Sequence, residues 1–183
     1  LASDGNVADR FGTSVALDGN TAVIGAPDPV GDSSGAAYVF TFDGETWNEQ
    51  QKLVSSDAEL RDDFGDSVAI DGDTIVASSH GDDNTGPSSS SGSAYVFVRS
   101  GGTWSLQTQL TADDAGSGDQ FGFSVAIDGD TALIGAVSAT KTRFWPSDHS
   151  ASTVSAIISA ASGHWLVGSP ARRRCRTAAW PSQ

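Results

Sequence analysis

Short apolar runs alternate with turn-forming polar residues along this chain, and one segment of this pattern occurs three times. The recurring segment reads FGTSVALDGNTAVIGAP at Phe11–Pro27, FGDSVAIDGDTIVASSH at Phe64–His80 and FGFSVAIDGDTALIGAV at Phe121–Val137. Successive copies start 53 and 57 residues apart. A period of this length, with each unit too short to bury a core alone, is typical of stacked structural repeats.

Each repeat is predicted to hold four short antiparallel strands. In the first repeat we expect strands at Ser14–Leu17, Thr21–Ile24 and Ala37–Phe42, and a fourth that carries Trp47. Asp18-Gly19 separates the first two strands, and such a pair forms a two-residue hairpin because glycine adopts positive φ without strain. Four-stranded antiparallel units at this period make propeller blades. The predicted fold class is therefore all-β, built of β-propeller blades of four antiparallel strands.

The aromatic residues and glycines that recur in each repeat are predicted to be structural. We expect each phenylalanine to fill the space between adjacent sheets and the glycine after it to permit a tight strand entry. The predicted structural residues are Phe11, Gly12, Phe64, Gly65, Phe121, Gly122, Trp47 and Trp104.

The repeat pattern is predicted to cover residues 1–137, with repeats starting near 11, 64 and 121, and to stop in the tail at 138–183. Net charge changes at the same boundary, from −18 before it to +5 after it. Three interpretations of the tail are open: a genuine divergent terminus, a degenerate blade, or a reading-frame error in the gene. We favour the last, and we expect Ser138–Ser152 and Ala171–Gln183 to be poorly ordered.

The charge pattern narrows the range of partners. The chain carries 23 acidic and 10 basic residues, and 20 of the acids are aspartate. A surface this acidic repels nucleic acid, so no nucleic-acid partner is predicted. A solvated acidic face is the favoured interpretation, with adaptation to high salt and collection of cations as alternatives. No apolar run is long enough for a membrane span, and the single cysteine, Cys175, excludes an internal disulfide.

Candidate chemistry is sparse. The polar loop after the second strand of each repeat carries Asp28, Asp32, Asp82 and Asp83, which are weak candidates for cation ligands, although a solvated loop is favoured. The three histidines share no metal-ligand spacing, and His80 is expected at the surface. No catalytic constellation is recognised, so we predict no catalytic residues, no enzyme and no cofactor.

The first repeat resembles the FG-GAP repeat, because Phe11-Gly12 is followed fourteen residues later by Gly25-Ala26-Pro27. That family implies the propeller of integrin α subunits and of many bacterial and archaeal surface proteins. About three repeats supply an incomplete propeller, either part of a longer chain or one that must oligomerise to close a ring. Calcium-binding blades of the family carry an Asp-x-Asp-x-Asp-Gly loop. Here the matching connection is a bare Asp-Gly turn, too short to surround calcium, so calcium is not carried over.

The resemblance implies a function for the scaffold. We expect a non-catalytic propeller that binds protein or glycan, as an adhesion module of an exported, extracellular or cell-surface protein. The alternative is the propeller part of a carbohydrate- or phosphoester-acting enzyme whose catalytic residues lie outside this chain. A purely structural spacer is a third possibility. No signal segment precedes the repeats in this chain.

Overall fold

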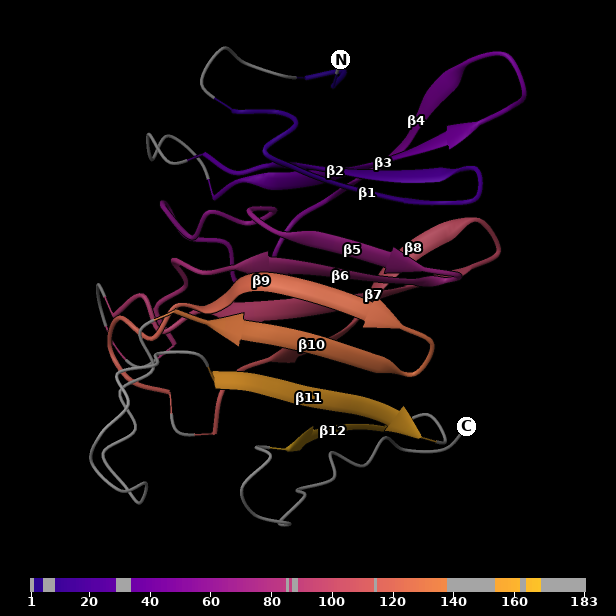
Figure 1. Ribbon diagram of the computed structural model, residues 1–183. Coiled ribbons are helices and arrows are strands. Elements are labelled where there is room, and N and C mark those ends of the chain that lie inside the picture. Colours follow the sequence, from indigo (N-terminus) through magenta and orange to yellow (C-terminus); the bar gives the residue numbers. More distant parts are fainter. Residues whose placement is uncertain are drawn as a thin grey trace.

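The computed structural model describes residues 2–4, 9–28, 34–84, 86, 89–113 and 115–137, and the main chain of 154–161 and 164–168. These residues form three four-stranded antiparallel sheets and no helix. The sheets lie one above another in chain order and do not close into a ring (Figure 1). The predicted all-β architecture of an incomplete propeller is therefore confirmed.

Every sheet has the same topology, with its strands side by side in sequence order. Sheet 1 contains β1 (Ser14–Asp18), β2 (Thr21–Ala26), β3 (Ala36–Phe42) and β4 (Trp47–Leu53). Sheet 2 contains β5 (Val68–Asp71), β6 (Thr74–Ser79), β7 (Ser93–Ser100) and β8 (Thr103–Leu110). Sheet 3 contains β9 (Phe121–Asp128), β10 (Thr131–Ala136), β11 (Val154–Ala161) and β12 (His164–Gly168). Two-residue turns join the first two strands of each sheet, at Gly19-Asn20, Gly72-Asp73 and Gly129-Asp130. They lie one residue later than the predicted Asp-Gly pairs, because each aspartate is the last paired residue of its strand.

The third sheet continues past the predicted end of the repeats at residue 137. Strand β11 pairs with β10, and β12 pairs with β11. Antiparallel ladders are made by main-chain hydrogen bonds, so these strands pair although their side chains do not follow the repeat pattern. The segments 138–153 and 169–183, which include all the residues expected to be poorly ordered, lie outside the described residues.

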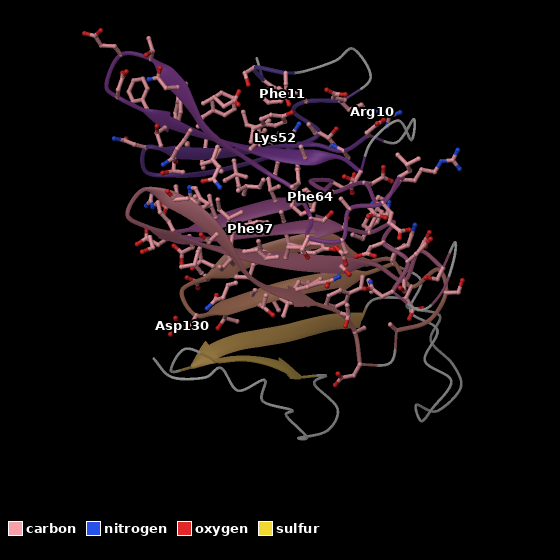
Figure 2. The ribbon with its side chains drawn as sticks, turned by 180° about the vertical axis from the view of Figure 1, so that it is seen from behind. Arg10, Phe11, Lys52, Phe64, Phe97 and Asp130 are labelled. Atoms are coloured by element: carbon pink, nitrogen blue, oxygen red, sulfur yellow. The ribbon has the colours of Figure 1, made fainter. Side chains whose placement is uncertain are left out.

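The hydrophobic core consists of layers between consecutive sheets. We call the face that carries Val15, Val68 or Val125 the leading face of its sheet, and the opposite one the trailing face. The trailing face of sheet 1 packs on the leading face of sheet 2, and the trailing face of sheet 2 packs on the leading face of sheet 3. Phe64 and Phe97 lie in the first of these layers, whereas Phe11 lies at the outer side of sheet 1 (Figure 2).

In the first two repeats the phenylalanine of the Phe-Gly pair packs on the third strand of its own sheet. The Phe64 ring lies 5.4 Å from the Tyr95 ring and 6.2 Å from the Phe97 ring. Phe64 and Phe121 are buried, and Phe11 is half-buried. The following glycine has positive φ, and a side chain at Gly65 would overlap the carbonyl of Ala36 in sheet 1. The Phe-Gly pair thus brings the chain close to the preceding sheet.

The two ends of the stack differ in their connections. Asp-Gly turns and the β3–β4 and β7–β8 hairpins lie at one end, while the longer loops and the connectors between sheets lie at the other (Figure 1). This separation follows from antiparallel order, because alternate connections of such a sheet share an edge. The described candidate residues in the loops, Asp28, Asp82 and Asp83, are therefore at one end of the molecule.

Candidate functional site

The longer connections of consecutive repeats touch one another and form a continuous surface, which we call the loop face. It consists of the described residues of 54–63, 80–92 and 111–120. The Gly81 amide donates to the Asp62 carbonyl at 3.2 Å. Further along, the Gly118 amide donates to the Ser89 carbonyl at 2.6 Å. These main-chain bonds join the loop of sheet 2 to the connectors before and after it, which orders the loop face as one unit.

A buried tyrosine holds the loop face to sheet 2. The hydroxyl of Tyr95 lies 2.7 Å from Asp57 Oδ1 and 2.7 Å from Asp82 Oδ2. Gln109 Nε2 donates to Asp57 Oδ2 at 2.8 Å and also reaches Asn84 Oδ1 at 3.3 Å. Burial raises the pKa of Tyr95 far above its usual range, and the two carboxylates add to the shift. Tyr95 therefore stays protonated and links connector, loop and strand β7.

The first repeat uses a charged version of the same arrangement. Tyr38 donates to Asp4 Oδ1 at 2.7 Å, and Lys52 Nζ lies 2.6 Å from Asp4 Oδ2. The hydrogen bonds from Lys52 and Tyr38 lower the pKa of Asp4. Lys52 and Gln109 occupy the same position of their repeats. The cluster of sheet 2 consequently has two carboxylates and no lysine, so it makes the loop face more negative there.

The predicted cation ligands do not gather at one point among the residues that the structure describes. Asp82 belongs to the Tyr95 cluster, whereas Asp83 Oδ1 accepts a 2.7 Å hydrogen bond from the Ser90 amide within its own loop. Asp28 is buried, and Asp32 lies outside the described residues. Within the described ranges no group of three or more His, Cys, Asp or Glu is arranged to hold a metal. Cation binding by these four residues stays a prediction.

His80 lies at the start of the loop, between two carboxylates, and it is less exposed than the surface position expected for it. Its Nδ1 is 3.4 Å from Asp66 Oδ2 and its Nε2 is 3.7 Å from Asp63 Oδ2. Its side chain is 18% exposed, and its ring contacts Phe123 of sheet 3 edge-on at 5.8 Å. The interaction with Asp66, followed by the charge of Asp63, raises the pKa of His80 despite burial. This group joins the connector to the next sheet.

The predicted structural tryptophans have different surroundings. Trp104 is 2% exposed and packs in the layer between sheets 1 and 2, and its amide donates to Gln51 Oε1 at 2.8 Å. Trp47, at the matching position of sheet 1, is 46% exposed and contacts Phe42 at 5.2 Å. Trp104 packs against the preceding sheet, whereas Trp47 has no preceding sheet to cover it among the described residues.

Asp62 supplies a pH-dependent prediction for the loop face. Burial raises the pKa of Asp62 to about 6, and the carboxylates of Asp82 and Asp57 add to the shift. The folded state therefore holds this proton more tightly than the unfolded chain, where aspartate titrates at 3.8. The stability that protonated Asp62 contributes to the fold is fully present below about pH 4 and is lost as the pH rises through the raised pKa.

We expect the parent chain to lose about 2 kcal/mol of unfolding free energy relative to Asp62→Asn when the pH rises from about 4.5 to about 7.5. The variant lacks the carboxyl group, so its stability does not depend on this titration. Asparagine retains an acceptor for the Glu59 amide, which donates to Asp62 at 2.7 Å. Urea unfolding at both pH values measures the effect. If the two chains instead change in stability equally between these pH values, the Asp62 carboxyl group is not the source of the pH dependence.

Three consecutive sheets of four antiparallel strands, stacked through apolar faces and bearing their loops at one end, define a β-propeller-type repeat protein. The FG-GAP repeat family matches residues 1–40, 47–97 and 104–152, so the chain belongs to that family. The third match extends into the tail that lacked a recognisable pattern. A comparison with curated proteins gives no match. Among the described residues no helix has the length and apolar character needed to cross a bilayer.

The Tyr95 cluster was not recognised as a unit in the sequence. A signal for it exists in the sequence. Tyr38 and Tyr95 each precede the tryptophan of their own repeat by nine residues, and Lys52 and Gln109 each follow their tyrosine by fourteen. Asp57 and Asp82 could not be assigned to that tyrosine, because many aspartates lie in the same loops and connectors. Their proximity to Tyr95 depends on how the loop of sheet 2 folds back over the connector.

Proposed function

We propose that this chain is a non-catalytic propeller scaffold that binds a protein or glycan ligand through its loop face, as part of an exported surface protein. The observation that carries the proposal is the hydrogen-bonded ordering of loops from consecutive repeats. A binding surface whose main chain is already ordered loses less conformational entropy when a ligand binds. FG-GAP repeats are typical of extracellular or surface proteins, so the family membership of the chain supports the location.

The chemistry of the loop face favours binding over catalysis. The carboxylates of Asp57 and Asp82 both lie within hydrogen-bond distance of the Tyr95 hydroxyl, which supports a structural use for them. The exposed tip of the first connector presents Glu59, Leu60 and Arg61 together. An apolar side chain flanked by opposite charges offers contact area and hydrogen bonding to a protein or glycan surface.

A glycan array and a screen of purified surface proteins test the proposal. The probes are the parent chain, the loop-face variant Leu60→Ala/Arg61→Ala and the control Glu45→Ala/Asp130→Ala at the hairpin end. All four side chains are exposed, so both variants should fold, which circular dichroism checks. We expect the loop-face variant to weaken binding at least about tenfold and the control to leave it unchanged.

Two outcomes would contradict the proposed function. One is the absence of binding to every glycan and protein tested with a chain shown to be folded. The other is an equal loss of binding in the loop-face variant and the hairpin-end control. Either result would favour a structural spacer, in which the loops have no ligand.

A further inference from the structure

Strand β1, on the leading face of sheet 1, lacks among the described residues the cover that the matching strands of the other sheets possess. Val15 is 69% exposed, whereas Val68, its counterpart in sheet 2, is 7% exposed. Leu17 is 65% exposed, whereas its counterpart Ile70 is 9% exposed. The residue types agree while the exposures do not. The difference arises because Val68 and Ile70 are covered by the trailing face of the preceding sheet.

The opposite face of the stack is also uncovered where it is described. Leu133 is at the position of Val23 and Val76, both of which are completely buried under the following sheet. Leu133 itself is 43% exposed. The described strands of sheet 3, β9 and β10, thus expose Leu133 on the trailing side, while strand β1 exposes Val15 and Leu17 on the leading side of sheet 1.

A polar contact recurs at both interfaces between sheets. The Asp18 carboxylate accepts a 2.7 Å hydrogen bond from the Gly72 amide in the Asp-Gly turn of the next sheet. In the same way the Asp71 carboxylate accepts from the Gly129 amide. Each aspartate lies in the Asp-Gly turn of its own sheet and reaches the turn of the following sheet. Continuing the series would pair Asp128 of sheet 3 with a glycine amide of a further sheet.

The glycine of the Phe-Gly pair shows the same relation. A side chain at Gly65 would overlap the Ala36 carbonyl of sheet 1, and a side chain at Gly122 would overlap the Ser93 carbonyl of sheet 2. Gly12 has the same positive φ, +96°, yet nothing lies within 4 Å of the place where its side chain would be. Sheet 1 thus keeps the backbone shape that admits a preceding sheet.

We propose that the leading face of sheet 1 docks the trailing face of sheet 3 of a second copy of this chain, with Asp128 of one copy accepting from the Gly19 amide of the other. This contact between molecules would have the same apolar packing as the contacts between sheets 1 and 2 and between sheets 2 and 3. It would also have the same hydrogen bond from a glycine amide to an aspartate carboxylate. Such a head-to-tail interface is heterologous, so it builds a ring if the rotation closes and a filament otherwise. It is independent of any ligand at the loop face.

Sedimentation of the purified chain, at concentrations up to about 100 µM, tests for this assembly. We expect multiples of the 183-residue chain. Leu17→Asp on the leading face and Asp128→Arg on the trailing side should each weaken self-association at least about tenfold. The matched control is Leu60→Asp, because Leu60 is also 65% exposed but lies on the loop face. A strictly monomeric parent, or equal weakening by Leu60→Asp, would overturn the proposal.

Cross-linking tests the direction of the contact. In a Cys175→Ser background, a Gly19→Cys chain is mixed with an Asp128→Cys chain and treated with a short bismaleimide. We expect a cross-linked dimer in the mixture and not with either chain alone. The double variant Asp18→Cys/Gly72→Cys, cross-linked within one chain, is the positive control, because these positions are hydrogen-bonded. Dimers formed by the Gly19→Cys chain alone would indicate a symmetric face-to-face contact and would overturn the head-to-tail arrangement.

Discussion

Replacing Phe64 with alanine is expected to lower the free energy of unfolding by about 3–5 kcal/mol, the range for removal of a buried phenylalanine. Phe64 is 0% exposed and lies in the layer between sheets 1 and 2. The substitution would leave a cavity beside the Tyr95 and Phe97 rings, which are also held by backbone pairing and cannot collapse fully into it. Urea unfolding followed by tryptophan fluorescence measures the loss.

The matched control for this prediction is Phe11→Ala. Phe11 stacks edge-on with Tyr38 and Phe40, just as Phe64 does with its own strand, but Phe11 is only half-buried. We expect a smaller loss of about 1–2 kcal/mol, since less apolar surface is removed from the interior. An unchanged midpoint for Phe64→Ala, or equal losses for the two variants, would show that cover by the neighbouring sheet does not set the effect.

Replacing Gly25 with alanine is expected to destabilise the fold by about 3 kcal/mol, the upper part of the range for an overfilled core. A side chain there would overlap the main-chain carbonyl of Gly65, which lies just before strand β5 of sheet 2. Relief would require sheets 1 and 2 to separate, because the overlapping Gly65 carbonyl is a main-chain group and not the end of a flexible side chain. The separation would also lengthen the 2.7 Å hydrogen bond from Ser14 Oγ to the same carbonyl.

Gly135→Ala provides the comparison for Gly25→Ala, because Gly135 holds the same position in sheet 3. A side chain at Gly135 would meet chiefly the hydroxyl of Ser124, which can change rotamer. We expect a change within about 1 kcal/mol of the parent. Thermal unfolding of both variants distinguishes them, and similar losses would exclude inter-sheet overlap as the cause at Gly25.

The strands and turns of the first two repeats could be predicted because their signals are local. Alternation of apolar and polar residues defines a strand that is buried on one face or both, and an Asp-Gly pair defines a hairpin. Strands β1 (Ser14–Asp18) and β2 (Thr21–Ala26) accordingly lie within two residues of their predicted bounds. Strands β11 and β12 lack the repeat pattern and were not predicted, because their pairing depends on main-chain groups that every sequence shares.

The candidate site was predictable only as a region. The sequence placed polar, aspartate-rich loops after the second strand and between repeats, and these do form the loop face. It did not reveal that Asp57 and Asp82, which are far apart along the chain, meet at the hydroxyl of Tyr95. Nor did it reveal that His80 lies between Asp63 and Asp66. Such contacts depend on the path of long loops, for which no short-range rule exists.

The sequence by itself therefore determined the repeat, the all-β class and the positions of the hairpin turns, since these follow from interactions between residues close together in the chain. Only the tertiary structure decided which copies of a repeated residue are buried. Trp104 and Trp47 occupy the same position of their repeats, yet one is 2% and the other 46% exposed. The reason is that burial here comes from the preceding sheet, about one repeat away in sequence, and sheet 1 has no described sheet before it.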